Sequence, residues 1–452
     1  MTQEPSLRTK MVYGAGGFGQ VLFWCLTTYF LMYYFTEVVG LPPSTASTIL
    51  LVATLVNGVT DFLVGVLADR SERNDARRYQ QFIGAALPFL ALGSMLTFFA
   101  PPGLGDDARA AYVLGALLAM LSAYSFVNIP YSAMLSVMSD DSFVRARIAG
   151  FKATFKQVAA FTVAVATLPL VHWLGGSDEA LGFRYTAMVY GVVGTLAVGL
   201  CAVVHIPGRI PENGTALPVR VEHTSFREIY RFLALNGPLW IVLGATFLWV
   251  VGQGMVFRAA AYYAKYFLKD PQMASWLLGV VAAGAVSIPA WVHFARRTSK
   301  RATWIACSIT SASALALLLL LEPGASPILA VAGFALTSVG LNGFAMNSHS
   351  ILADTLEYGE WKSGIRCQAF VFALLTMTFK LAAGLSAVAL GLVLEAAGVS
   401  GGAEASPAAL ARIEWMTCAI PAAMFALSAA LVSFFPIDAR MHRRIVEALA
   451  LR

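Results

Sequence analysis

Four ionisable residues stand inside long apolar stretches of the sequence: the acid Asp61 and the bases Lys156, Arg258 and Lys380. Ionisable groups in such stretches are costly and usually functional. A single desolvated carboxylic acid suits proton binding, because burial disfavours its charged form. The excess bases need anionic partners. We expect Asp61 to pair with Lys380, and a carboxylate or sulfonate on a bound solute to be a further partner.

The rest of the chain is too apolar for a soluble protein. Its 452 residues are 58% hydrophobic and 12% charged, with a mean hydropathy of +0.71. Soluble domains are about 45–50% apolar and about 25% charged. The composition therefore excludes a cytosolic enzyme, a disordered protein and a nucleic-acid binder. It predicts an all-α membrane protein in a lipid bilayer, whose net charge of +6 reflects topology.

Long apolar runs supply the elements that must hold the ionisable residues. A membrane-spanning helix needs about 20 mostly apolar residues, and twelve runs meet this requirement. Six lie in the first half, at 15–38, 45–68, 80–100, 110–137, 154–175 and 184–206. Six lie in the second half, at 238–266, 273–295, 302–321, 327–350, 368–396 and 413–436.

Positive charge is distributed unevenly over the loops between these runs. With the N-terminus inside, far more of the 31 Lys and Arg residues fall on the inside than on the outside. Basic loops remain cytoplasmic, so both termini are expected to be cytoplasmic. The sequence thus predicts an integral protein of a plasma membrane, of the bacterial inner-membrane type.

A polar stretch divides the runs into two sets of six. The predicted domains are a six-helix bundle at 1–206, a cytoplasmic linker at 207–237, and a second six-helix bundle with a cytoplasmic tail at 238–452. The linker ends in SFREIYRFLAL, which is typical of a short amphipathic surface helix. Six plus six spans is the outline of the major facilitator fold, in which two halves rock about a central site.

The loop after the second run supports this fold. It carries Gly65, Asp69 and Arg70 in the pattern G-x-L-x-D-R, followed by more arginines. This pattern resembles the major facilitator loop signature. The Asp, at a helix end, is expected to pair with nearby Arg residues and latch one conformation; the alternative is an ordinary charged loop.

Four further segments, spread over both halves, carry a more specific resemblance. They are YGAGGFG at 13–19 leading to LMYYFTEVVG at 31–40; NIPY at 128–131 followed by basic residues; RAAAYYAKY at 258–266; and ADTLEYGEWKSGIR at 353–366. In order and spacing they resemble the glycoside–pentoside–hexuronide:cation symporter family, to which the melibiose permease belongs. The resemblance implies cation-coupled sugar transport by a monomeric unit, with no cofactor other than a coupling H+ or Na+.

The family's cation site corresponds to residues on the second and fourth spans. The resemblance implies that Asn57 and Asp61 occupy the positions of its two carboxylates, with Thr60 and Ser125 beside them. Residues at i and i+4 lie on one helix face, so both side chains can reach one ion. An amide in place of one carboxylate weakens a sodium site, and this favours a proton. The alternative is that Asp61 only stabilises helix packing.

The sugar site also departs from the family pattern. The positions of its two sugar-binding aspartates correspond to Val21 and Asn128, and its binding arginine to Lys152. Tyr124 and Tyr131 flank Asn128 on the same span, where rings can stack on a pyranose. Because sugar-binding acids are missing and bases are in excess, an acidic glycoside, hexuronide or sulfonated sugar is favoured over a neutral galactoside.

Structural roles remain open for the bases. The alternative for Lys156 is that its side chain extends to the cytoplasmic interface. For Arg258 the alternative is a structural ion pair or backbone contact, and for Lys380 it is a latch between helices. At the inner gate we expect Asp69 and Arg70, at the end of the second run, to act with Asp354, Glu357 and Arg366, which follow the tenth run.

The sequence fits other classes of function less well than it fits a symporter. A lysophospholipid-type lipid transporter of the same fold is the alternative, and a wide lateral opening between helices would distinguish it. No nucleophile–base pair, phosphate loop or metal-ligand spacing indicates an enzyme, and no residue is assigned to a metal.

Overall fold

The computed structural model describes residues 6–70, 76–101, 103–139, 142–204, 226–365, 367–398 and 406–450. All regular structure within these residues is helical. The first half forms α1 (Leu7–Tyr33), a π-helical turn (Tyr34–Val38), α2 (Pro43–Arg70), α3 (Ala76–Thr97), α4 (Asp106–Val137), α5 (Ser142–Gly175) and α6 (Glu179–Val203). The second half forms α7 (Phe226–Leu235), α8 (Gly237–Tyr262), a π-helical turn (Tyr263–Phe267), α9 (Met273–Ala283), a 3-10 turn (Gly284–Ser287), α10 (Ile288–Arg297), α11 (Lys300–Leu318), α12 (Pro327–Ser363), α13 (Gln368–Ala397), α14 (Pro407–Glu414), a third π-helical turn (Trp415–Ala419), α15 (Ile420–Ser433) and α16 (Ala439–Ala450).

Twelve helical spans in the described residues are long and apolar enough to cross a membrane. Each overlaps one of the twelve runs expected from the sequence, so the predicted all-α, twelve-span membrane protein is confirmed. The domain boundaries at 206/207 and 237/238 stay a prediction.

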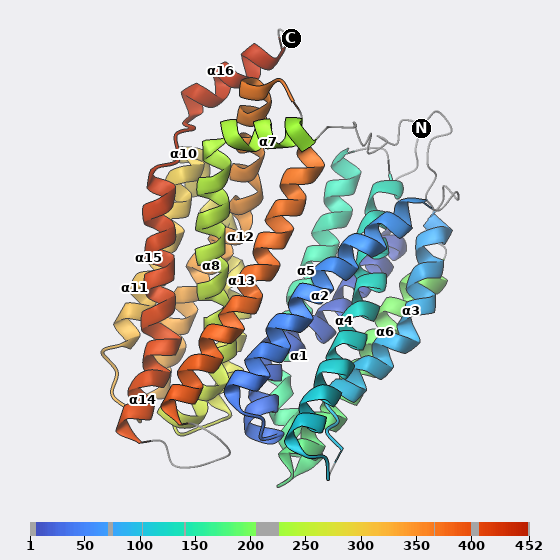
Figure 1. The fold of residues 1–452 in the computed structure, drawn as a ribbon, viewed down its shortest axis with the longest axis vertical. Coiled ribbons are helices and arrows are strands. Elements are labelled where there is room, and N and C mark those ends of the chain that lie inside the picture. The colour runs from blue at the N-terminus through green and yellow to red at the C-terminus, as the bar shows by residue number, and fades with distance from the viewer. Residues whose placement is uncertain are drawn as a thin grey trace.

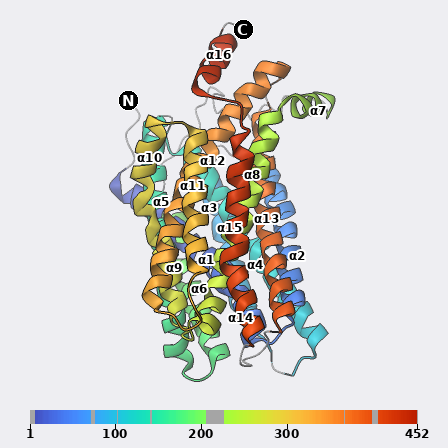
Figure 2. The same cartoon turned by 90° about the vertical axis from the view of Figure 1, so that its left-hand side faces the viewer.

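The spans form two bundles that lie side by side. Figure 1 shows α1 to α6 in one bundle and α8 to α15 in the other. Across the interface α2 packs against α13, α5 against α9, and α1 against α8. The start of α1 and the C-terminal helix α16 lie at the same end of the molecule (Figures 1 and 2). Toward that end the ribbons of the bundles diverge, and at the opposite end they converge (Figure 1).

Two spans differ from the expected pattern. The eighth is divided by the 3-10 turn Gly284–Ser287, because Pro289 has no N–H to donate to the carbonyl four residues earlier. The tenth was expected to end near residue 350, but α12 continues to Ser363. No residue in this polar segment interrupts the helix until Gly364, whose φ of 72° ends it in the left-handed conformation.

The expected amphipathic helix at the end of the linker is present as α7. Its Phe232 is fully buried and packs where Gly359 of α12 leaves space. The Asn236 amide, directly after α7, donates a 2.9 Å hydrogen bond to the carbonyl of Thr355. The opposite face of α7 remains exposed at Tyr230. These contacts fix α7 to the extended end of α12.

Close approach of α1 and α6 depends on glycine and gives a stability prediction. A Cβ at Gly194 would lie 2.7 Å from the Phe23 ring and 3.1 Å from the Gly19 carbonyl oxygen, whereas a Cβ at Gly191, one turn earlier, would meet no atom within 4 Å. We therefore expect Gly194→Ala to destabilise the protein by about 1–3 kcal/mol through overpacking. Thermal unfolding in detergent measures the effect, with Gly191→Ala as the control. Equal melting temperatures for both variants would contradict this packing.

Candidate functional site

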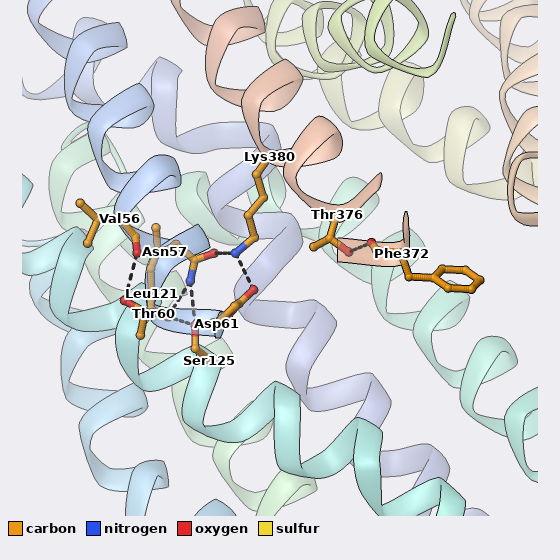
Figure 3. A network of polar contacts seen from close by, with 9 residues as sticks. All are labelled: Val56, Asn57, Thr60, Asp61, Leu121, Ser125, Phe372, Thr376 and Lys380. Atoms are coloured by element: carbon orange, nitrogen blue, oxygen red, sulfur yellow. Dashed lines mark hydrogen bonds and ion pairs between the residues drawn. The ribbon is translucent and has the colours of Figure 1, made fainter. Parts of the chain in front are cut away.

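The acid Asp61 lies on α2, where α4 and α13 meet it (Figure 3). Its Oδ2 pairs with the Nζ of Lys380 at 2.5 Å, so the structure contains the ion pair expected from the sequence. Its Oδ1 accepts a 2.5 Å hydrogen bond from the hydroxyl of Ser125. Since Lys380 belongs to the second bundle, this ion pair joins the two halves of the molecule.

Asn57 completes the cluster one helical turn before Asp61. Its Oδ1 accepts a 2.8 Å hydrogen bond from Lys380. Its Nδ2 donates to the hydroxyl of Ser125 at 2.8 Å and to the carbonyl of Leu121 at 3.1 Å. Every polar atom of the amide is therefore used, and this fixes its orientation. We call Asn57, Asp61, Ser125 and Lys380 the interface cluster (Figure 3).

Local sequence explains this geometry. Asn57 and Asp61 share a helix face because they are four residues apart. Gly58 lies between them and faces the Lys380 stem, since a Cβ there would lie 3.4 Å from the lysine Cδ, an ordinary contact distance. The side chains of Asp61 and Lys380 are 20% and 13% exposed, so the ion pair is largely but not completely buried. The predicted cation ligand Thr60 points elsewhere, because its hydroxyl donates to the carbonyl of Val56 (Figure 3).

Aromatic rings surround the predicted sugar-binding residues on α4. Tyr124 stacks on Trp24 of α1 with ring centroids 5.7 Å apart, and Trp24 is 41% exposed in the middle of its helix. Asn128 is half-buried. Tyr124 itself is buried, so Trp24 and Asn128 are the two of these residues that leave ring or amide surface available to a solute.

Tyr131 differs from its neighbours on α4. It is fully buried and stacks on Tyr13 with centroids 4.5 Å apart. The hydroxyl of each tyrosine donates to the carbonyl of the other, at 2.5 and 3.1 Å. In this conformation Tyr131 thus fastens α4 to α1 and does not offer its ring or hydroxyl to a substrate.

Three predicted substrate-binding bases have no carboxylate partner within the described residues. Lys152 of α5 lies 4.6 Å from the centre of the Tyr131 ring and 3.4 Å from the hydroxyl of Ser132. Lys156 is one turn further along, and its stem packs at Gly17. Among the residues that the structure describes, neither side chain forms an ion pair with an acid. Neither amino group therefore has a carboxylate counterion within the described part of the chain.

Arg258 of α8 is held by neutral groups. Its guanidinium donates to the hydroxyl of Ser386 at 2.8 Å and to the carbonyl of Gly254 at 3.2 Å. A planar guanidinium suits bidentate binding of a carboxylate or sulfonate. The side chain is half-buried, and the described residues place no acid against it.

The predicted gate residues divide into two groups. The side chains of Asp69 and Arg70, at the end of α2, and Arg366 lie outside the described residues. Asp354 pairs with Lys300 at 2.6 Å, and Glu357 lies 2.8 Å from the imidazole of His442 on α16. These contacts connect α11, α12 and α16 within the second bundle, and the described residues show no bond from them to the first bundle.

Sequence reasoning missed two polar residues, one on the same helix face as Trp24 and one bonded to Arg258. Gln20 on α1 is fully buried, and neither atom of its amide has a partner in the described chain. Ser386, which fixes Arg258, was also missed. The available signal for Gln20 was an amide inside an apolar run, four residues before Trp24 and therefore on the same face.

Comparison with known proteins agrees with this architecture. A family model described as "MFS/sugar transport protein" matches residues 12–439. An isoprimeverose transporter of Lactiplantibacillus pentosus is 26% identical, covering 95% of this chain and 88% of its own length. A protein of Salmonella typhimurium, provisionally assigned as a sulfoquinovose importer, is 26% identical over 100% of this chain and 94% of its own.

Solved structures show the same fold. The crystal structure of a D-xylose–proton symporter superposes with a TM-score of 0.68 at 14% identity, covering 95% of this chain and 97% of that one. Together with the matched family model, this accounts for the two bundles and the twelve spans. The protein is an integral membrane transporter and not an enzyme, and the chain belongs to the MFS/sugar transport protein family.

Proposed function

We propose that this protein is a proton-coupled symporter that imports an acidic sugar or glycoside by alternating access. The observation that carries the proposal is the interface cluster, in which one carboxylate is neutralised by a lysine of the other half. The described relatives named for isoprimeverose and sulfoquinovose support a sugar-type substrate. In this proposal the transport unit is a monomer, both termini are cytoplasmic, and no cofactor is needed besides the coupling ion.

Coupling follows from competition for Asp61. A cation that binds the carboxylate displaces the ammonium of Lys380, which removes an ion pair between α2 and α13. Cation binding then changes the balance between the two access states. Substrate binding that favours the same state must strengthen cation binding in return, because linkage is reciprocal.

A proton satisfies this cluster better than a sodium ion. Sodium requires several hard oxygen ligands. The side-chain oxygen of Asn57 already accepts a hydrogen bond from Lys380, and the NH2 group of Asn57 donates one to the Ser125 hydroxyl. Asp61 therefore supplies the only carboxylate of the interface cluster. A proton needs one carboxylate oxygen and no further ligands.

A negatively charged substrate would provide a counterion for the unpaired bases. Lys152, Lys156 and Arg258 are basic side chains without a carboxylate partner among the described residues, in a medium where an unpaired charge costs several kcal/mol. An acidic sugar would supply a counterion to their protonated forms. Its apolar ring face would stack on the exposed ring of Trp24, which packs against Tyr124, while its hydroxyls bond to Asn128.

Counterflow in proteoliposomes tests the substrate class directly. Vesicles preloaded with a hexuronide, a sulfonated sugar or a neutral glycoside are assayed for exchange with external labelled sugar. The proposal predicts exchange of acidic sugars and weaker or no exchange of neutral ones. Exchange restricted to neutral glycosides would refute the acidic specificity, and exchange of lysophospholipid alone would refute sugar transport.

Restoring a second carboxylate is expected to change the coupling ion. In Asn57→Asp, two carboxylates face one site, so the variant should gain sodium-stimulated uptake that the wild type lacks. Uptake is measured with a sodium gradient at constant pH, using Gln272→Glu as a control that adds an acid at an exposed position outside the interface cluster and the proposed sugar site. Sodium stimulation of the wild type to the same extent would show that one carboxylate suffices.

A further inference from the structure

The first helix of each bundle ends in the same way. Residues 33–42 read YYFTEVVGLP and residues 262–271 read YYAKYFLKDP. Both segments contain a π-helical turn at the same place, Tyr34–Val38 and Tyr263–Phe267. Each then turns through a residue with positive φ, 77° at Gly40 and 58° at Lys269.

The backbone hydrogen bonds of the two ends also correspond. Leu41 N–H donates to the carbonyl of Phe35 at 2.9 Å, and Asp270 N–H donates to that of Ala264 at 3.0 Å. These donor and acceptor pairs occupy equivalent positions in the two segments. The local structure is thus repeated, as the two-fold relation between the halves of this fold requires.

Equivalent side chains meet where the bundles converge. The rings of Tyr33 and Tyr262 touch edge-on with centroids 5.7 Å apart. The Tyr262 hydroxyl lies 2.6 Å from that of Thr36, and the Lys265 ammonium lies 5.4 Å from the centre of the Tyr33 ring. Thr36 and Lys265 are equivalent positions, as are Tyr33 and Tyr262. Each half therefore contacts the other through the same pair of positions, as in an isologous contact.

One strong charge contact reinforces this arrangement. The carboxylate of Glu37 pairs with Lys265 at 2.5 Å and accepts a 2.7 Å hydrogen bond from the hydroxyl of Tyr266. Its side chain is 0% exposed, and its second oxygen has no partner in the described residues. A buried carboxylate that depends on the opposite bundle for its counterion strongly favours the closed arrangement.

We infer that Glu37, Lys265 and Tyr266, with the Tyr33–Tyr262 contact, form an outer clamp that holds this end of the transporter shut. The clamp lies at the end away from α16 (Figure 1), which the proposed topology places outside the cell. It must break before substrate enters from outside. Its π-helical turns supply the irregular backbone that is common at functional sites. The inference rests on alternating access, which is part of the proposed function.

Distances between spin labels test the clamp without substrate. Ser177 and Glu322 are exposed on outer loops of the two bundles, and the five native cysteines are buried, so cysteines at 177 and 322 can be labelled selectively. We expect one short distance in the wild type. Glu37→Gln or Lys265→Gln should raise the ratio of long to short distances roughly tenfold, as loss of a charge-assisted hydrogen bond implies.

Two controls keep the result interpretable. Lys269→Gln removes an exposed lysine four residues on and should leave the distance unchanged. The charge exchange E37K/K265E should restore the short distance that either single reversal, E37K or K265E, lengthens. Unchanged distances in both Gln variants, or folded single reversals that the exchange does not rescue, would overturn the clamp. Since no substrate is present, failure of the sugar proposal would leave this result intact.

Discussion

Asp61→Asn is expected to abolish gradient-driven accumulation of substrate while leaving exchange across the membrane measurable. The amide preserves the shape of the side chain and its contact with Ser125, but it cannot carry a proton. Each pH unit supplies about 1.4 kcal/mol, or tenfold accumulation. With a gradient of about two units the wild type should therefore accumulate substrate up to about 100-fold, and the variant should only equilibrate it.

Uptake and counterflow in the same proteoliposomes separate coupling from transport. Asp107→Asn, an exposed acid in the first turn of α4, is the matched control and should accumulate substrate as the wild type does. Accumulation by Asp61→Asn would place the coupling site elsewhere. Loss of counterflow as well would mean that the Asp61–Lys380 pair is required for the conformational change itself.

Arg258→Gln is expected to raise the KM for an acidic sugar about 10- to 100-fold with little change in the maximal rate. The guanidinium is already oriented by Ser386 and Gly254, and a hydrogen bond to a charged group contributes about 1.5–3 kcal/mol. A neutral glycoside of the same ring size should show no such change, because it has no anionic group to lose a partner. Initial uptake rates over a range of sugar concentrations give both constants.

A second arginine provides the control for Arg258. Arg184 of α6 lies over the ring of Phe99 and has no carboxylate partner among the described residues. Arg184→Gln should leave the KM for both sugars unchanged. If Arg258→Gln instead lowered the uptake of acidic and neutral sugars equally, then Arg258 would be a structural contact of α8 and α13, the alternative already recognised from the sequence.

The sequence was sufficient for the features that depend on hydropathy and charge. Long apolar runs predicted all twelve spans, because the bilayer imposes a length that composition reveals. The excess of buried bases over acids indicated that the bases need anionic partners, and the structure pairs Lys380 with Asp61. The amphipathic pattern likewise predicted the helix that became α7.

Features that depend on the packing of distant segments could not be predicted in this way. The polar end of α12 continues as helix because α7 and α16 pack on it, and the burial of Tyr131 depends on its pairing with Tyr13 of another span. Glu37 and Lys265 were each visible at the end of an apolar run. That they form one contact follows only from the meeting of the two bundles.

Proton movement on addition of sugar tests the central proposal most directly. Proteoliposomes in weak buffer, with a pH-sensitive dye outside and no imposed gradient, receive a hexuronide or sulfonated sugar. The proposal predicts that the external medium becomes alkaline with wild-type protein, because a proton enters with each acidic sugar bound at the bases, and that Asp61→Asn gives no change. Uptake of the labelled acidic sugar with no change in external pH, in the presence or absence of sodium, would contradict proton coupling.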